Sequence, residues 1–295
     1  MNSSRKYLFV VNPISGDLDK SDMIQSVQAA AKDRNIEIHV FETDGKNDET
    51  QIRDWYDANK PERVLVAGGD GTIKMVAETL EDCDVIFGLI PAGSANGLSV
   101  DLEFPTDFEA VIDIAFDGKP KAIDMVCINN IKSIHLSDLG LNASLVKNYE
   151  QSSIRGKIGY ALQSINTLKE EGEPFNVRIE ANGGIIESEA RMVVVANSQK
   201  YGTGVVINPM GKLDDGKFEI VLLKTLDLIL FGKIITGNMP LDTGEIEIIS
   251  TDKATITTNV PIHFQVDGEY CGEESKLDVY MLPGQMKIAH PLPAE

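Results

Sequence analysis

A glycine-rich turn directly follows a short apolar run near residue 68, and this junction limits the possible fold more than any other feature. The run Arg63-Val-Leu-Val-Ala67 has the length and β-branched content of a buried strand, and Gly68-Gly-Asp-Gly-Thr72 comes directly after it. Two similar junctions carry the loops Asn12-Pro-Ile-Ser-Gly16 and Pro91-Ala-Gly-Ser-Ala-Asn-Gly97. The sequence therefore predicts repeated units in which a strand leads through a loop into a helix.

Strand-like and helix-like segments alternate up to about residue 126. Apolar residues recur with helical spacing in the helix-like segments, and Ser21 is a candidate N-cap for the first of them. Alternation of this kind predicts a parallel sheet with helices on both faces. The expected strands are Lys6–Asn12, Ile36–Phe41, Arg63–Ala67 and Val85–Ile90, and the expected helices include Asp19–Arg34 and Asp48–Lys60.

The chain becomes rich in β-strand patterns after Asp124, with a domain boundary expected near Met125–Asn130. Turn signals such as Asn182-Gly183-Gly184 and Asp215-Gly216 separate these runs, so antiparallel hairpins of a sandwich or barrel are expected. Helical patterns remain only at Ile158–Glu171 and Leu226–Ile235. The expected strands are Asn176–Ala181, Arg191–Ala196, Phe218–Leu223, Ala254–Thr258 and Leu277–Tyr280.

The three glycine-containing loops fit a site that binds phosphate groups. In an open parallel sheet, ligands bind where strand ends meet helix N-termini, because free backbone N–H groups and the helix dipole attract anions there. Glycine lets the backbone approach a ligand closely, and each loop adds a short hydroxyl or amide side chain. Any one of these loops alone is more often an ordinary turn. Asp70 would repel phosphate unless a cation lies between them, so it implies Mg²⁺ or a Mg²⁺-bound water.

Two carboxylates, Asp267 and Glu269, flank a glycine near the C-terminus in Phe264-Gln-Val-Asp-Gly-Glu-Tyr270. Local sequence favours a plain hairpin here, because Asp-Gly is a strong turn signal. Close to the phosphate loops, however, one of these carboxylates would serve as a general base for an attacking hydroxyl.

The net charge of −19 argues against nucleic-acid binding, because it repels a polyanion at long range. No apolar run reaches the roughly 20 residues that span a membrane, and no signal-peptide pattern is visible at the N-terminus. The three cysteines are odd in number and widely spaced, which favours a reducing compartment. We therefore expect a cytoplasmic protein.

Five motifs, in order along the chain, resemble those of the diacylglycerol kinase catalytic-domain family, which includes bacterial lipid kinases and sphingosine kinases. The resemblance implies an N-terminal α/β domain like those of NAD kinases and phosphofructokinases, and a C-terminal β-sandwich, with ATP in the cleft between them. It also implies that residues 284–295 return to the nucleotide-binding domain of residues 1–126, and that residues 127–283 bind the lipid. The motifs are Asn12-Pro-Ile-Ser-Gly16, Gly68-Gly-Asp-Gly-Thr72, Pro91-Ala-Gly-Ser-Ala-Asn96, Leu213-Asp-Asp-Gly216 and Val266-Asp-Gly-Glu269.

The resemblance implies transfer of the ATP γ-phosphoryl group to a lipid hydroxyl. Transient membrane contact would use local apolar or basic patches, and the sheet edges of a β-rich domain favour a homodimer. The resemblance makes Glu269 the proton acceptor, with Asp267 as a rival or partner, and places Asp70 and Asp124 in a network of Mg²⁺ and water. The implied nucleotide-binding residues are Asn12, Pro13, Ile14, Ser15, Gly16, Thr43, Gly68, Gly69, Asp70, Gly71, Thr72, Ser94 and Asn96. A structural Mg²⁺ would take the main-chain oxygens of Lys212 and Lys217 and the Asp215 carboxylate, although a plain turn is the stronger local interpretation.

The sequence departs from the family pattern at several positions. Lys74-Met75 stands where Asn-Glu is usual, Gly97 replaces an aspartate typical of diacylglycerol kinases, and Ser144 replaces the aspartate that binds the lipid amine in sphingosine kinases. A kinase of a soluble alcohol and a non-catalytic nucleotide- or lipid-binding protein therefore remain alternatives. Two interpretations of the basic stretch Tyr149–Lys157 remain open: it guides a lipid headgroup, or it is an ordinary solvated connection. His135 and His263 are expected to be packed in the interior rather than catalytic.

Overall fold

The chain divides into two compact units. The computed structural model describes residues 5–17, 19–94, 96–140, 143, 173–201, 205–225 and 244–291. Unit 1 comprises Met1–Ile123 and Gly284–Glu295, and unit 2 comprises Asp124–Pro283. The expected helices at Ile158–Glu171 and Leu226–Ile235, the stretch Tyr149–Lys157 and Ser144 lie outside the described residues.

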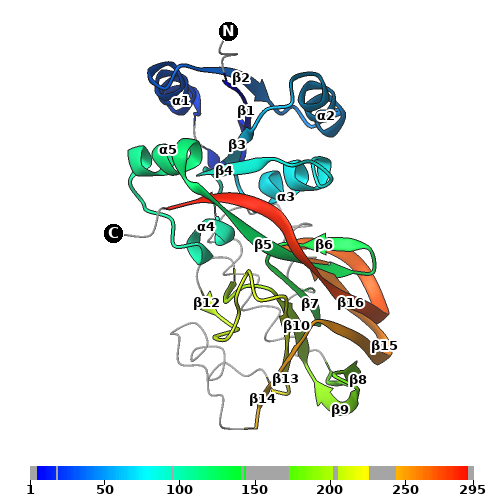
Figure 1. Cartoon of the computed structure of the whole chain (residues 1–295). Coiled ribbons are helices and arrows are strands. Elements are labelled where there is room, and N and C mark those ends of the chain that lie inside the picture. The colour runs from blue at the N-terminus through cyan, green and yellow to red at the C-terminus, as the bar shows by residue number, and fades with distance from the viewer. Residues whose placement is uncertain are drawn as a thin grey trace. The chain divides into compact units, whose positions relative to one another are not determined.

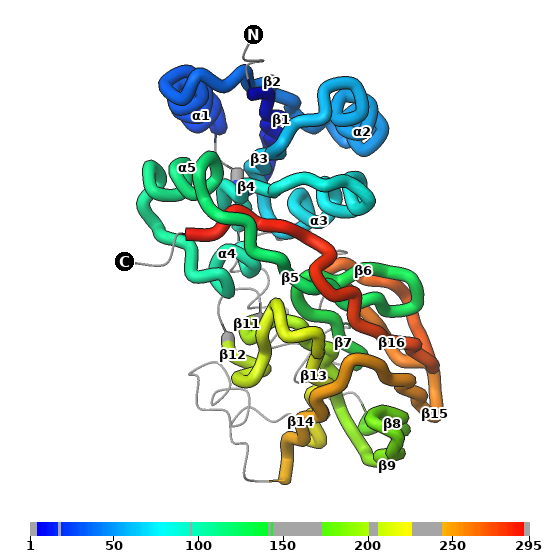
Figure 2. Tube along the Cα trace, viewed as in Figure 1, coloured from blue at the N-terminus to red at the C-terminus, as the bar shows by residue number. Residues whose placement is uncertain are grey.

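Unit 1 contains a parallel sheet in which β1 (Arg5–Val11) lies between β2 (Ile36–Glu42) and β3 (Arg63–Gly68). β4 (Ile86–Pro91) extends the sheet beyond β3, also in parallel. The last part of β16 (Glu269–His290) pairs with β4 through Lys287 and Ile288, and it is the red end of the trace in Figure 2. Because the chain leaves β1 toward β2 on one side and reaches β3 on the other, the sheet has its topological switch point between β1 and β3.

Helices cover both faces of this sheet, as the alternating sequence pattern predicts. α1 (Ser21–Asp33) and α5 (Phe108–Asp117) lie on one face, and α2 (Asp48–Asn59) and α3 (Asp70–Thr79) lie on the other (Figure 1). Alternate strand residues face alternate sides, so one core contains side chains of β1 and β3 packed against α1 and α5. Its fully buried members include Tyr7, Phe9, Val11, Leu65, Val27, Ala31, Ala115 and Phe116.

The expected N-cap of α1 is wrong by one residue. Lys20 occupies the N-cap position, and Ser21 is the first helical residue. The Asp19 carboxylate accepts hydrogen bonds from the Ser21 backbone N–H at 2.9 Å and from its hydroxyl at 2.7 Å. The capping acceptor is thus the carboxylate that precedes the serine, which is an equally suitable acceptor for an N-terminal N–H group.

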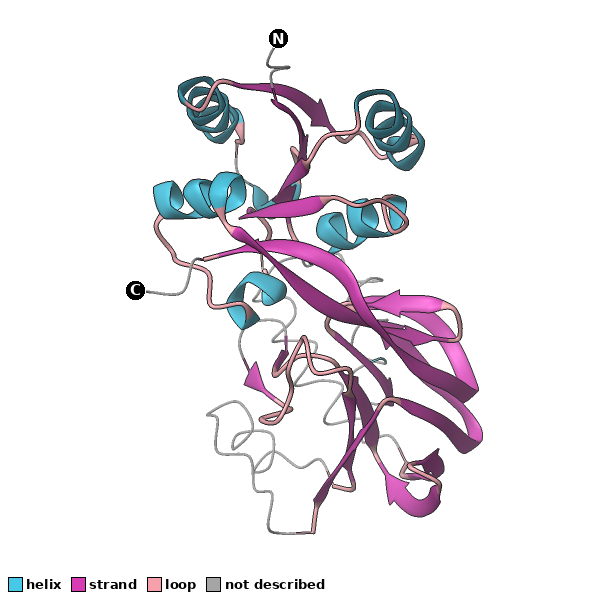
Figure 3. Ribbon diagram, in the orientation of Figure 1, coloured by secondary structure: helices cyan, strands magenta, loops and turns pink. Residues whose placement is uncertain are grey.

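Unit 2 is built mainly from antiparallel strands (Figure 3). The sheet runs in the order β14, β13, β10, β7, β15 and β16, with β8 beside β15, β9 beside β8, and β5 paired with β6. A core of apolar side chains from these strands includes Val193, Phe218 and Phe264, all at most 1% exposed. The strands are β5 (Lys119–Ile128), β6 (Ile131–Ser133), β7 (Leu136–Gly140), β8 (Phe175–Ala181), β9 (Gly184–Ala190), β10 (Met192–Ala196), β11 (Lys200–Tyr201), β12 (Val205–Val206), β13 (Phe218–Leu223), β14 (Ile246–Thr251) and β15 (Lys253–Val266).

The Asp-Gly sequence at residues 267–268 forms the hairpin turn that its local signal predicts. Val266 pairs with Glu269, so Asp267 and Gly268 are the only two turn residues between β15 and β16. Their φ angles are 49° and 87°, and positive φ at both positions is the mark of a type I′ turn. In the described ranges, no helix is long and apolar enough to cross a membrane.

Candidate functional site

The loops that follow β1, β2, β3 and β4 lie along one edge of the unit 1 sheet, because the strands are parallel. They contain Asn12–Gly16, Thr43, Gly68–Thr72 and Pro91–Gly97 respectively. The loops after β1, β3 and β4 are called the first, second and third loop below. The first and second loops meet at the switch point, where the Asn12 side-chain amide donates to the Thr72 hydroxyl at 3.1 Å. The structure therefore brings together three loops that the sequence singled out separately.

The first loop is stabilised by its own backbone and by Asn12. The Asn12 carboxamide oxygen accepts from the Ile14 N–H at 3.2 Å, which makes a local Asx turn. The Asn12 backbone N–H donates to the Ala67 carbonyl at 2.9 Å and so continues the pairing of β1 with β3. This turn leaves Ile14 81% exposed at the tip of the loop.

Glycine is required where the three loops touch. Gly16 has φ 66°, and a Cβ on it would lie 2.6 Å from the Ala92 carbonyl oxygen. A Cβ on Gly93 would lie 2.4 Å from the Cα of Gly69, a distance that real side chains do not show. The backbones of the loops after β1, β3 and β4 are therefore in direct contact, and no larger residue fits between them.

Asp70 joins the loop after β3 to the helix that follows β4. Its two carboxylate oxygens accept from the backbone N–H groups of Gly97 at 2.7 Å and Leu98 at 3.1 Å. These N–H groups begin the short helix α4 (Gly97–Asp101), so Asp70 satisfies two of its free donors. In addition to any role toward a cation, Asp70 thus fixes the third loop against the second.

The third loop closes on itself through Asn96. Its carboxamide oxygen accepts from the Gly93 N–H at 2.8 Å, and its amide donates to the Gly93 carbonyl at 3.0 Å. The Asn96 side chain therefore holds the shape of the loop, whereas Ser94 is exposed at its surface. Thr43 is partly buried, and its N–H donates to the Val11 carbonyl at 2.9 Å at the end of the paired strands β1 and β2.

Two buried lysines beside these loops were not selected from the sequence as site residues. Lys20 is 4% exposed, and its ammonium group donates to the Ser15 carbonyl at 2.6 Å. Lys74 is 8% exposed and lies one helical turn after Asp70 in α3. Lysine is almost never buried without a compensating group, so the position of Lys20 favours a nearby anion. In the sequence, the one indication is that Lys74 follows Asp70 by four residues, a spacing that places the two side chains on the same face of a helix.

In unit 2, Asp267 and Glu269 have different surroundings. The Asp267 carboxylate accepts from the Ser133 hydroxyl and from the backbone N–H groups of Ile134, His135 and Leu136, at 2.9 to 3.2 Å. Glu269 is exposed, and its carboxylate makes no hydrogen bond within the described part of the chain. The first carboxylate anchors the hairpin turn, while the second is available to a ligand.

Asp124 contacts the turn at Lys212–Lys217, which is the expected site of a structural Mg²⁺. It is 4% exposed, and its carboxylate accepts from the Gly216 N–H at 2.8 Å. The exposed Asp215 carboxylate accepts from the Lys217 N–H at 3.1 Å, which is the contact of an Asx turn. Over the described ranges, no group of three or more His, Cys, Asp or Glu side chains is arranged to hold a metal ion. Lys212, Asp215 and Lys217 therefore form a turn whose binding of Mg²⁺ stays a prediction.

The two histidines of interest are packed against neighbours. His135 is 7% exposed, and its Nδ1 lies 2.5 Å from the Ser198 hydroxyl. The ring of His263 contacts Tyr270 edge to face, with its Nδ1 3.0 Å from the Tyr270 hydroxyl.

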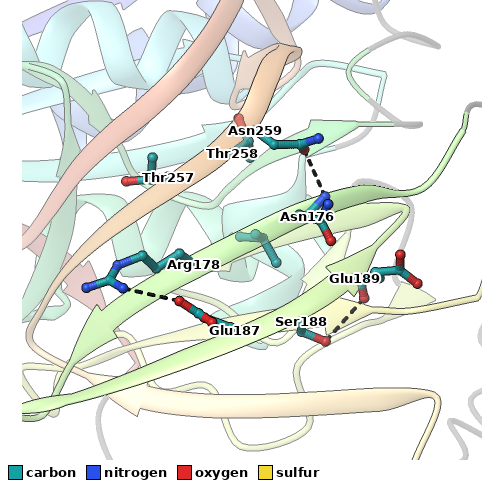
Figure 4. A pocket seen from close by; sticks show the side chains of 9 residues that line it. Asn176, Arg178, Glu187, Ser188, Glu189, Thr257, Thr258 and Asn259 are labelled. Carbon is teal, nitrogen blue, oxygen red and sulfur yellow. Dashed lines mark hydrogen bonds and ion pairs between the residues drawn. The ribbon is translucent and has the colours of Figure 1, made fainter.

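A groove of about 560 Å³ lies on β8, β9 and β15 (Figure 4), and no residue of the five motifs lines it. Arg178, its most basic lining residue, is already paired with Glu187 at 3.2 Å and with Glu180 at 3.1 Å. The groove therefore offers no unpaired positive charge to a phosphorylated ligand.

Comparisons with known proteins agree with this geometry. Residues 6–128 match the diacylglycerol kinase catalytic domain, and residues 138–290 match the YegS C-terminal NAD kinase beta sandwich-like domain. The diacylglycerol kinase of Bacillus subtilis is 27% identical over 94% of this chain and 91% of its own length. A solved structure of a proposed diacylglycerol kinase from Bacillus anthracis has a TM-score of 0.81 and 25% identity, and the alignment covers 99% of this chain and 98% of that one.

Another relative, an uncharacterized protein of Synechocystis, is 28% identical over 78% of this chain, which spans 55% of that longer protein. Together, the matches confirm the predicted combination of an N-terminal α/β domain with a C-terminal β-sandwich domain.

Proposed function

Because the chain belongs to the diacylglycerol kinase catalytic-domain family and is a phosphotransferase that acts on an alcohol group, we propose that it transfers the γ-phosphoryl group of ATP to a diacylglycerol-like lipid hydroxyl. The observation that carries the proposal is the close contact among the loops after β1, β3 and β4, where Gly16 and Gly93 leave no room for a side chain and so bring three loop backbones together at one edge of the sheet. Backbone N–H groups at such a strand edge favour the binding of polyphosphate.

The first loop and the second would hold the nucleotide phosphates. Asn12 and Thr72 are already joined by a hydrogen bond, so their positions are set before a ligand arrives. Prepositioned groups lower the entropic cost of ordering the phosphates for transfer. Ser94, which is exposed on the third loop, would donate its hydroxyl hydrogen to a phosphate oxygen.

Positive charge at the site would come from Lys20 and from Mg²⁺. The buried ammonium of Lys20 keeps two further donors after its bond to the Ser15 carbonyl, and a nucleotide phosphate would supply the anion that a buried lysine requires. Mg²⁺ needs only one or two carboxylates when phosphate oxygens and water complete its shell, and each Asp70 oxygen retains acceptor capacity beyond its backbone bond. When bound, Mg²⁺ would neutralise charge that develops on the transferred group.

Glu269 is the better candidate for the general base. The lipid hydroxyl oxygen would form a bond to the γ-phosphorus as the bond to the bridging β–γ oxygen breaks, and its proton would pass to a carboxylate. The carboxylate of Asp267 is occupied by donors from residues 133–136, whereas that of Glu269 is free of hydrogen bonds to the described residues and exposed. We therefore assign Asp267 to holding the turn and Glu269 to accepting the proton.

The replacement of usual acidic residues by Met75 and Gly97 does not argue against turnover. Lys74, beside Met75, adds a buried positive charge, and Gly97 contributes a backbone N–H to the Asp70 carboxylate. A site with fewer acidic groups repels polyphosphate less, so fewer metal ions are needed to bind it.

Transfer of label from γ-³²P ATP tests the proposal. The chain is incubated with Mg²⁺ and mixed micelles that contain diacylglycerol, and in a parallel reaction with sphingosine. We expect label in the organic phase with diacylglycerol. Label in a soluble product of the aqueous phase would instead indicate a soluble alcohol as the acceptor, and binding of ATP without any transfer would indicate a non-catalytic protein.

A further inference from the structure

A buried polar pair lies directly behind the hairpin turn that carries Glu269. Asp138 on β7 and Gln265 on β15 are cross-strand partners, and both are completely buried. The Gln265 amide donates to the Asp138 carboxylate, while the Gln265 carboxamide oxygen accepts from the Gly268 N–H at 2.7 Å. Three groups are thus linked in a chain from the sheet interior to the second residue of the turn.

The chemistry of the pair permits only one orientation of Gln265. A carboxylate presents acceptors alone, so the amide nitrogen of Gln265 must face Asp138. Its oxygen then points the opposite way, toward the Gly268 N–H. Asp138 therefore determines which end of Gln265 reaches the turn.

Burial of this pair is costly for the fold. A carboxylate and a carboxamide lose favourable hydration in the interior, and an apolar pair of similar size would stabilise a sheet at least as well. The adjacent cross-strand pair, Phe264 with Leu139, is apolar and equally buried. A polar pair next to it points to a requirement for geometry rather than for stability.

Asp267 holds the other residue of the same turn. Its carboxylate is bound by four donors from residues 133–136, and its N–H donates to the Leu136 carbonyl at 3.0 Å. Asp267 and Gly268 are thus fixed by separate hydrogen bonds, and both residues have positive φ. Glu269 follows immediately and pairs with Val266, so its backbone position depends on the turn.

We propose that Asp138 and Gln265 are positioning residues for catalysis, which hold the turn through Gly268 so that the Glu269 carboxylate is presented in the orientation that accepts the substrate proton. This inference rests on the proposed function and on the role of Glu269 within it. A misplacement of about 1 Å in a reacting group lowers a rate roughly a hundredfold, so a relaxed turn lowers kcat while substrate binding is unchanged.

The test uses steady-state kinetics of the full chain with ATP and diacylglycerol micelles. We expect Asp138→Leu and Gln265→Met each to lower kcat by about tenfold or more, with both KM values unchanged within about twofold. Asp138→Asn keeps an oxygen that accepts from the Gln265 amide, so it retains most of the rate. The double variant Asp138→Leu/Gln265→Met loses no more than the worse single variant, because the two residues act as one unit.

Thr258→Val is the matched control, because Thr258 lies on the same strand, is buried and donates to the Val260 carbonyl at 2.7 Å. It lowers the melting temperature without lowering kcat. If Asp138→Leu does not fold, Gln265→Met is measured together with exchange of the Gly268 amide hydrogen, which we expect to accelerate. Wild-type kcat in a folded Gln265→Met variant, or an equal loss in Asp138→Asn and Asp138→Leu, overturns the inference.

Failure of the proposed function is distinguishable from failure of this inference. If the wild-type chain transfers no phosphate to lipid, or if Glu269→Gln keeps the wild-type rate, the role of Glu269 is wrong and the inference falls with it. If Glu269→Gln loses its rate while the Asp138 and Gln265 variants keep theirs, only the inference is wrong.

Discussion

The side-chain amide of Asn12 donates to the hydroxyl of Thr72 at 3.1 Å and thereby joins the loops that follow β1 and β3. These strands are neighbours in the sheet but are separated by a complete strand and two helices in the chain. The bond lies at the switch point of the sheet, where open α/β folds bind their ligands.

Replacement of Asp70 by asparagine should abolish most of the activity and also weaken the fold. Asparagine has one acceptor oxygen, so its amide nitrogen must face the N–H of either Gly97 or Leu98. Loss of a charge-assisted hydrogen bond costs about 1.5 to 3 kcal/mol, and we expect kcat to fall roughly a hundredfold or more. Thermal unfolding and the transfer assay measure the two effects.

The control for that variant is Asp107→Asn, which makes the same substitution at the N-cap of α5, where Asp107 accepts from the Ala110 N–H at 2.9 Å. Asparagine and aspartate are similar as N-caps, so this control should leave both properties nearly unchanged. Equal rates in Asp70→Asn and Asp107→Asn would mean that Asp70 has no special role.

Replacement of Lys20 by methionine should weaken nucleotide binding specifically. Methionine fills a similar volume but removes the buried ammonium group, so a contact with a nucleotide phosphate is lost. We expect KM for ATP to rise about tenfold, equivalent to about 1.4 kcal/mol, while KM for the lipid is unchanged. Lys32→Met, at an exposed position in the last turn of α1, is the control. Unchanged KM for ATP in Lys20→Met would remove Lys20 from the site.

The two carboxylates of the hairpin should give opposite results. Glu269→Gln is expected to lower kcat by about a hundredfold or more with an unchanged melting temperature, because Glu269 is exposed and its carboxylate is not hydrogen-bonded to the described residues. Asp267→Asn is expected to lower the melting temperature, because an amide nitrogen replaces an acceptor that faces the Ile134 N–H. Full activity in Glu269→Gln would transfer the role of base to Asp267.

Acid should remove one surface contribution to stability. Hydrogen bonding to Arg53, at 2.5 Å, lowers the pKa of Asp82 to about 2. Since this is below the value of about 3.9 in an unfolded chain, the contribution is present above pH 4 and is lost as the pH falls toward 2. Asp82→Asn should therefore melt at a lower temperature than the wild type at pH 7, and the difference should disappear between pH 4 and pH 2. Asp54→Asn, at an exposed position of α2, should show no such pH-dependent difference.

The sequence alone predicts those strands and turns that depend on neighbouring residues in the chain. The strands of unit 1 follow from short runs of apolar and β-branched residues, and the turn at Asp267-Gly268 follows from the preference of that dipeptide for positive φ. The contacts that define the site are not local. Asp70 binds backbone groups 27 and 28 residues away, and Gln265 binds Asp138 across 127 residues.

Residue type alone also hides the roles of Lys20 and Asn96. A lysine in a polar loop resembles any exposed lysine until the fold buries it, and Lys20 is 4% exposed. Asn96 fits a ligand-binding loop by composition, but its carboxamide is used within the loop, by Gly93. Both outcomes depend on how the loops after β1 and β4 pack, which the spacing of motifs does not encode.

Hydrogen exchange of the backbone amides with and without ATP and Mg²⁺ tests the central claim most directly, because it reports where the polyphosphate binds without requiring turnover. The account predicts slower exchange in residues 12–16, 68–72 and 91–97, and loss of that protection in Asp70→Asn but not in Asp107→Asn. Protection confined to other segments, or an unchanged pattern at saturating ATP, would contradict it.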